Sequence, residues 1–268
     1  MNQRIFQVDA FTAEPYKGNP AGVCILDKAK DERWMQSVAG EMNVAETAFL
    51  KRDKESANTF GLRWFTPTVE VELCGHATLA SAHLLWEEHQ VEPESPINFQ
   101  TRSGLLTAVR AGEWIELDFP TEPAESEGTY QAELKSALDV ELLYVGRNRL
   151  DFIVEVANER VLRSVEPDLR RLRGLGSRGV ILTSGADDPK YDFVSRFFAP
   201  GAGVDEDPVT GSAHCCLGPF WKERLGREEM LGYQASSRGG EVRVRVMGNR
   251  VLLGGQAVTV LCGDLLFE

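Results

Sequence analysis

The sequence carries the same arrangement of residues twice, and this repeat limits the possible folds more than any other feature. The first copy reads Arg63-Trp-Phe-Thr-Pro67 and, after an acidic loop, Cys74-Gly75-His76-Ala77-Thr78. The second copy reads Arg196-Phe-Phe-Ala-Pro200 and, after another acidic loop, Thr210-Gly211-Ser212-Ala213-His214. In each copy a strand ends at a proline, and a Gly-x-Ala pattern opens a helix of small residues. The repeat therefore predicts a duplicated domain.

The two helices opened by these glycines lack an ordinary solvent-facing side. Polar side chains are few from Ala77 to Trp86 and do not form one stripe, and Ser212–Trp221 is equally short of charge. We expect Pro219 to kink or end the second helix. A helix that is apolar nearly all round must be buried on all sides. By contrast, Asp31–Met42 has its apolar residues on one stripe and predicts a surface helix with Asp31 near its N-cap.

Only strands are abundant enough in this chain to surround two buried helices. Short runs rich in β-branched and aromatic residues predict them at Arg4–Phe11, Pro20–Leu26, Ala45–Lys51, Gly61–Phe65, Ile97–Thr101, Leu105–Arg110, Trp114–Phe119, Phe152–Val156, Gly179–Thr183, Asp192–Phe198, Glu241–Val246, Arg250–Gly254 and Ala257–Leu266.

The predicted fold is α+β, with two similar domains, each a curved antiparallel, β-barrel-like sheet around one central helix. We expect the domains at residues 1–119 and 120–268, with the polar, proline-containing segment Pro120–Gly128 as the linker. The active site is expected in the cleft between the domains, where the N-termini of both buried helices would meet.

Composition narrows the class of protein. The formal net charge of −12 disfavours general binding to nucleic acid or to an anionic membrane surface. No apolar run approaches the roughly 18 residues of a membrane helix, and the N-terminus has no apolar signal core. The cysteines are odd in number and contain no Cys-x-x-Cys pair, which is typical of a reduced cytoplasm. We expect a cytoplasmic protein that acts on a small molecule.

The helix N-termini and a nearby glutamate are candidates for chemistry. Gly75 and Gly211 allow close approach to unpaired backbone N–H groups, which suits a carboxylate or another small anion, although both glycines also suit a tight strand-to-helix turn. Glu46 stands at the start of an apolar strand. Burial there would raise its pKa from about 4.3 towards the range useful for acid–base catalysis. An exposed glutamate at a turn is the alternative.

The remaining motifs argue against metal and cofactor chemistry. His76 lies at the start of the first buried helix, where it can donate to an anion or relay a proton. A metal site from Cys74, His76, Cys215 and Cys216 is rejected, because no compact ligand spacing appears. No dinucleotide-binding, P-loop or nucleophile-elbow motif is present, so we expect no cofactor.

Several blocks of the sequence resemble the phenazine-biosynthesis PhzF-like family and stand in its order over nearly the whole chain. They are Gln7-Val-Asp9-Ala-Phe11, Gly18-Asn19-Pro20-Ala21-Gly22, Ala45-Glu46-Thr-Ala-Phe49, Phe65-Thr-Pro67, Cys74-Gly75-His76-Ala77-Thr78 and Glu206-Asp207-Pro-Val-Thr-Gly211-Ser212-Ala213. The resemblance implies the diaminopimelate-epimerase-like fold, in which the last strand can cross back to the first domain, and it implies a homodimer.

The resemblance also implies a mechanism. The family's characterised enzyme isomerises trans-2,3-dihydro-3-hydroxyanthranilate without a cofactor by moving a proton. Its catalytic glutamate corresponds to Glu46, and its site histidine and aspartate correspond to His76 and Asp207. The resemblance places Asn19, Gly75, Gly211 and Ser212 in substrate binding. The implied function is a cofactor-independent isomerase of a small cyclic or amino carboxylate.

Two alternatives remain open from the sequence. Cysteine-dependent racemases of this fold use one thiol before each glycine turn, and Cys74 occupies the first place whereas Thr210 occupies the second. Threonine cannot act as a base near neutral pH, although a one-thiol enzyme with Asp207 as the partner is conceivable. The other alternative is a non-catalytic protein that binds a small carboxylate.

Overall fold

The computed structural model describes residues 3–267, and the chain divides into two compact units. Unit 1 contains the residues up to Asp118 together with those from Gly254 onward, and unit 2 runs from Phe119 to Leu253. The C-terminal segment therefore belongs to the same unit as the N-terminus.

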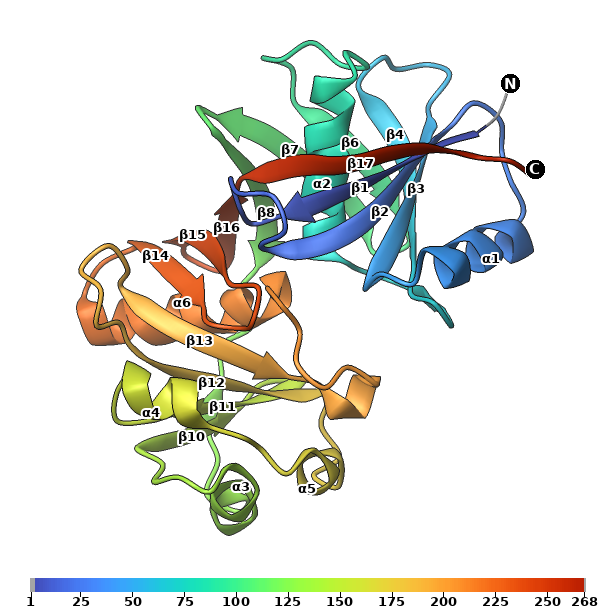
Figure 1. Cartoon of the computed structure of the whole chain (residues 1–268). Helices are drawn as coiled ribbons and strands as arrows, with labels where there is room; N and C mark the ends of the chain where they lie inside the picture. The colour runs from blue at the N-terminus through green and yellow to red at the C-terminus, as the bar shows by residue number, and fades with distance from the viewer. Residues whose placement is uncertain (1–2, 268) are drawn as a thin grey trace. The chain divides into compact units, whose positions relative to one another are not determined.

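Unit 1 combines a sheet with two helices. Its elements are β1 (Gln3–Ala10), β2 (Asn19–Leu26), α1 (Glu32–Met42), β3 (Glu46–Arg52), β4 (Thr59–Phe65), β5 (Glu70–Val71), α2 (Gly75–Glu87), β6 (Ile97–Thr101), β7 (Gly104–Ala111), β8 (Trp114–Pro120) and β17 (Ala257–Leu265). The returning strand β17 pairs antiparallel with β1, and Figure 1 shows it in red beside β1 in dark blue.

Unit 2 contains the second copy of the pattern with additional short helices. Its elements are β9 (Glu125–Ser126), α3 (Gln131–Leu138), β10 (Tyr144–Arg147), β11 (Asp151–Glu155), α4 (Glu159–Ser164), α5 (Leu169–Arg173), β12 (Gly179–Gly185), β13 (Phe193–Phe198), the 3-10 helix η1 (Pro200–Ala202), α6 (Gly211–Leu225), β14 (Glu229–Gln234), β15 (Gly240–Met247) and β16 (Arg250–Gly255). Of these elements, the sequence patterns did not predict the strands β9, β10 and β14, the 3-10 helix η1, or the helices α3, α4 and α5.

The strand pairings confirm two similar domains. In unit 1 the pairs β1/β2, β3/β4 and β6/β7 are antiparallel, and the pairs β2/β3 and β4/β6 are parallel. Unit 2 repeats this order, with β10/β11, β12/β13 and β14/β15 antiparallel and β11/β12 and β13/β14 parallel. Even the outermost pair is repeated, because β9 lies antiparallel to β10 as β17 does to β1.

The sheets differ from the prediction in two respects. They are mixed rather than antiparallel. Two neighbouring parallel strands need a crossover connection between them. The helix α2 connects β4 to β6 in this way, and α6 connects β13 to β14. Among the residues that the structure describes, β17 pairs with β1 but not with β8, and β9 pairs with β10 but not with β16, so the strands of neither unit close into a barrel. The α+β class and the central helix of each unit are as predicted.

The central helices are buried as their composition requires. Most of α2 is buried, and the helix contacts β1, β2, β3 and β17 (Figure 1). Helix α6 does not end at Pro219 but continues to Leu225. Because proline has no N–H to give to the carbonyl four residues earlier, that carbonyl of Cys215 needs another donor. The backbone N–H of Glu122 supplies it at 3.0 Å.

Candidate active site

Glu46 and His76 form an ion pair in unit 1. Glu46 is the first residue of β3, and His76 is the second residue of α2. Atom Nε2 of His76 lies 3.1 Å from Oε2 of Glu46, with the two side chains only 7% and 20% exposed. The turn at Gly75 places the imidazole of His76 at the start of the buried helix α2. The carboxylate of Glu46, at the start of β3, lies beside it.

Two further polar side chains surround the imidazole of His76. The Nδ2 atom of Asn19, the first residue of β2, lies 3.3 Å from Nδ1 of His76. The sulfur of Cys74, the residue before α2, lies 3.5 Å from the same ring nitrogen. Unit 1 thus brings together Asn19, Glu46, Gly75 and His76, which were predicted at the site.

The charges of this cluster favour a carboxylate beside an imidazolium. Burial raises the pKa of Glu46, but the charge and hydrogen bond of His76 and a hydrogen bond with Cys74 outweigh it, so the pKa is lowered. Burial lowers the pKa of His76, but its close contacts with the sulfur of Cys74 and with the carboxylate of Glu46 raise that pKa well above 6.5. The expectation that burial would raise the pKa of Glu46 is therefore wrong, because the sequence did not show the His76 partner.

Cys74 is a poor base in these surroundings. Burial and the negative charge of Glu46 raise the pKa of its thiol to about 11, against the lowering effect of His76. Because a thiol with this pKa stays protonated near neutral pH, it is not an activated nucleophile.

The central helices α2 and α6, like α3, begin without a capping side chain, unlike α1, α4 and α5. Asp31, Asn158 and Asp168 cap α1, α4 and α5 by accepting a backbone hydrogen bond. The N-cap residues of α2 and α6, Cys74 and Thr210, make no such side-chain bond. Their first N–H groups are therefore not satisfied by a capping side chain, as an anion-binding helix end requires.

The other predicted residues lie together in unit 2. The hydroxyl of Thr210 donates to Oδ2 of Asp207, and Nε2 of Gln234 donates to the backbone oxygen of Asp207 at 2.8 Å. Gly211 and Ser212 are the first residues of α6, and Ser212 is partly exposed. Gln234 lies on β14, which the sequence patterns missed, so its contact with the aspartate loop was not foreseen.

The acidic loops of the repeat are mainly structural. Nε of Arg63 donates to Glu70 at 2.6 Å, and Nε of Arg196 donates to Glu206 at 2.7 Å. Each arginine is the first residue of its copy of the motif, so both units hold the loop by the same ion pair. Glu70 and Glu206 therefore fix the loops beside the two helix starts.

His214 has a different role from His76. Its Nδ1 lies 2.8 Å from the carbonyl of Thr210, as the hydroxyl of Thr78 donates to the carbonyl of Cys74 at 2.6 Å. Burial lowers the pKa of His214 to about 4, so the ring is neutral. The side chain of His214 thus bonds to the N-cap carbonyl of α6, as the side chain of Thr78 bonds to the N-cap carbonyl of α2.

One group of side chains in unit 1 has ligand types that bind metals. Ligand atoms of Glu46, Cys74 and His76 lie within 4.8 Å of one another. Zinc binding at this group would require the thiol of Cys74 to lose its proton and the imidazole of His76 to be neutral.

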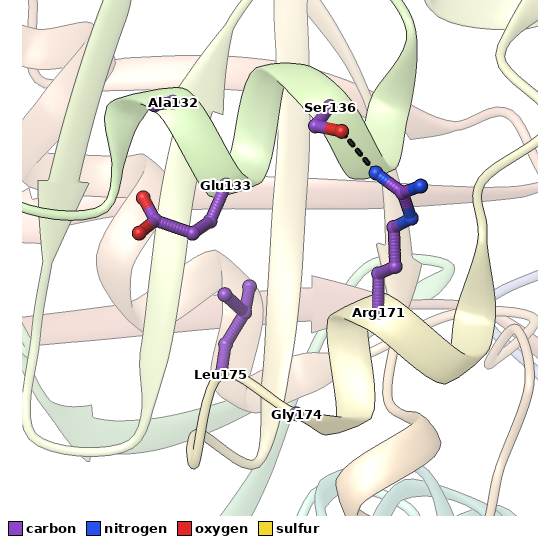
Figure 2. Close-up of a pocket in the computed structure, with 6 residues that line it drawn as sticks. All are labelled: Ala132, Glu133, Ser136, Arg171, Gly174 and Leu175. Atoms are coloured by element: carbon purple, nitrogen blue, oxygen red, sulfur yellow. Dashed lines mark hydrogen bonds between the residues drawn. The ribbon is translucent and has the colours of Figure 1, made fainter.

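A separate pocket in unit 2 contains none of the predicted site residues. It measures about 470 Å³ and lies between α3 and α5, where Figure 2 shows Arg171 reaching Ser136.

No helix among residues 3–267 is long and apolar enough to cross a membrane.

Comparison with known proteins agrees with the fold. The chain is 53% identical over 266 residues to an uncharacterized isomerase of Halalkalibacterium halodurans, covering 99% of both chains. The structure of this chain matches that of a PhzF-family phenazine biosynthesis protein of Enterococcus faecalis. The TM-score is 0.94 and the sequence identity is 38%, with 100% of both chains covered. A probable proline racemase from Agrobacterium radiobacter shares the fold, with a TM-score of 0.64 and 14% identity over 99% of this chain and 93% of that one.

The prediction of an isomerase is confirmed at the level of these relatives. The model of the family described as "Phenazine biosynthesis-like protein" matches residues 8–263, which include every predicted site residue. The resemblance inferred from the motifs is thus confirmed over nearly the whole chain. The chain belongs to the phenazine biosynthesis-like protein family.

Proposed function

We propose that this chain is a cofactor-independent isomerase that moves a proton within a small cyclic or amino carboxylate. Glu46 removes the proton from one carbon and returns it to another, so that the protein ends in its starting state. His76 and Asp207 orient polar substituents of the substrate. Asn19, Gly75, Gly211 and Ser212 bind the substrate, the last three through its carboxylate.

The Glu46–His76 pair is the observation that carries this proposal. A lowered pKa keeps Glu46 in the carboxylate form, which can accept a proton. A raised pKa keeps His76 as an imidazolium, whose charge stabilises the negative charge that develops on a deprotonated substrate. Both side chains lie beside the uncapped start of α2, so an anionic substrate would meet backbone N–H groups there.

Hydrogen NMR in D2O tests the proposal. The native protein is incubated with dihydro-hydroxyanthranilate-like and amino-acid carboxylates, and the ring and α-protons are followed. Migration or loss of a proton signal is the expected result for at least one cyclic carboxylate. Binding of these carboxylates without any proton exchange would instead support a non-catalytic binding protein.

A cysteine-dependent racemase is the second candidate, because Cys74 lies within reach of both His76 and Glu46. We expect Cys74→Ser to keep kcat within about tenfold of the native value, whereas loss of an acid–base group costs about 10²–10⁴-fold. The reason is that the thiol pKa of about 11 leaves the thiol protonated, and serine can occupy its place. Steady-state kinetics of the variant decide between the two candidates, since a racemase would lose its activity.

The pH dependence of kcat/KM follows from the two shifted groups. Glu46 has a lowered pKa and must be ionised, so the acid limb is expected below the ordinary value of 4.5. His76 has a raised pKa and must be protonated, so the alkaline limb is expected above the ordinary value of 6.5. A kinetic series from about pH 4 to about pH 10 should therefore show a broad plateau. An alkaline decline already complete by neutral pH would contradict the charge assignment.

A further inference from the structure

Arg178 in unit 2 connects a buried aspartate to the predicted substrate-binding serine. Its Nε donates to Oδ1 of Asp151 at 2.9 Å, and its Nη2 donates both to Oδ2 of Asp151 and to Oγ of Ser212, the latter at 3.0 Å. The sequence analysis did not select Arg178, because its two partners lie far away along the chain.

The surroundings hold the guanidinium of Arg178 in one orientation. Asp151, at the start of β11, is only 1% exposed, and its two carboxylate oxygens meet the planar guanidinium side by side. The central carbon of the guanidinium also lies 5.3 Å from the ring centroid of Phe197. The backbone N–H of Arg178 donates to the carbonyl oxygen of Leu150. The arginine side chain nevertheless stays 31% exposed, so it lies at the edge of a solvent-accessible region.

This arrangement determines what the hydroxyl of Ser212 can do. Because the oxygen accepts a hydrogen bond from Arg178, the hydroxyl hydrogen must point away from the guanidinium. Ser212 is the second residue of α6, whose first N–H groups have no side-chain cap. The hydroxyl hydrogen and these N–H groups are all donors, which is the pattern that a carboxylate accepts.

The repeat shows that the fold does not require this ion pair. Aligning the two copies of the motif places Phe198 at the position of Phe65, and the strand registers then place Arg178 at the position of Ala45. The same registers place Asp151 at the position of Ala21. Unit 1 builds the same sheet with two alanines at these places, so the charged pair in unit 2 serves something other than the sheet.

We propose that Arg178, fixed by Asp151, is a positioning residue that directs the hydroxyl of Ser212 towards the carboxylate of the substrate and so selects carboxylate ligands. The inference rests on the proposed function in one respect, namely that the substrate is a small carboxylate. The inference adds which residue makes the site prefer a carboxylate. Proton transfer by Glu46 is a separate step.

Titration calorimetry with anthranilate tests the proposal, with the neutral 2-aminobenzamide as the comparison ligand. The native protein should bind anthranilate and discriminate against the amide. Arg178→Met and Ser212→Ala should each weaken anthranilate binding about tenfold or more, as expected for a hydrogen bond to a charged group. The double variant should be no weaker than Ser212→Ala alone, because both changes remove the same interaction. Arg178→Lys should restore part of the affinity.

Matched controls separate positioning from folding. Arg171 also joins an aspartate and a serine hydroxyl, since it pairs with Asp168 and reaches Ser136, but it lies at the α3/α5 pocket (Figure 2). Arg171→Met should leave anthranilate binding unchanged. If Arg178→Met does not fold because Asp151 is left without its partner, the neutral pair Asp151→Asn with Arg178→Met replaces it.

Three outcomes would overturn the inference. They are native-like anthranilate affinity in a folded Arg178→Met variant, additive losses in the double variant, and no binding of anthranilate to the native protein at millimolar concentrations. The result is independent of catalysis, because anthranilate binding requires no proton transfer. Failure of the glutamate mechanism would appear instead as turnover that survives the loss of Glu46.

Discussion

Replacing Glu46 with glutamine is expected to lower kcat by about a thousandfold, within the range that a general acid–base group contributes. Glutamine has nearly the shape of glutamate and can still accept a hydrogen bond from Nε2 of His76, which lies 3.1 Å from the carboxylate. It cannot take up a proton from carbon. The variant should therefore bind ligands and fold, but hydrogen NMR in D2O should show migration of substrate protons slowed by about the same factor.

Glu70 offers a matched control for this experiment. Its side chain is only 8% exposed and lies in the same unit, but its carboxylate is paired with Arg63 and Arg102. Glu70→Gln should retain turnover while losing part of that ion-pair network. Undiminished turnover in Glu46→Gln, combined with loss of turnover in Cys74→Ser, would replace the glutamate mechanism with a thiol mechanism.

The parts of the site that were predicted from the sequence carry a local signal. His76 directly follows the glycine that opens a helix without a polar face, and Glu46 directly precedes an apolar strand. Their positions in the chain are therefore fixed by the elements that they begin. That the two side chains meet as an ion pair depends on tertiary packing, which explains why the direction of the pKa shift of Glu46 was predicted wrongly.

The parts that were missed depend on distant contacts. Strand direction could not be assigned because alternation of side chains is the same in parallel and antiparallel strands. Strand β14 contains both Glu229 and Gly232, which weaken the strand pattern. Arg178 sits in a polar loop before β12, and nothing near it in sequence reveals Asp151 and Ser212 as its partners.

The buried helix of unit 1 supports the second large prediction, which concerns stability. We expect Leu79→Ala to lower the free energy of unfolding by about 3–5 kcal/mol, in the upper part of the range for such changes. Leu79 on α2 is fully buried and packs against Gly255, just before β17, where an added Cβ would lie 2.7 Å from its Cδ1 and 2.5 Å from Cδ1 of Phe11. Because Gly255 has no side chain, it offers no side-chain atoms to fill the space that the leucine leaves.

Urea denaturation of the native protein and the variant measures this loss. Leu105→Ala is the matched control, because the same atoms are removed from a side chain on β7 that is 66% exposed, and its effect should stay within about 0.5 kcal/mol. A loss below about 1 kcal/mol in Leu79→Ala would mean that the site collapses around the smaller residue. In that case the position of α2, the helix that carries His76, would not depend on the packing of Leu79. A large loss would show that the packing of Leu79 in the core of unit 1 holds that helix in place.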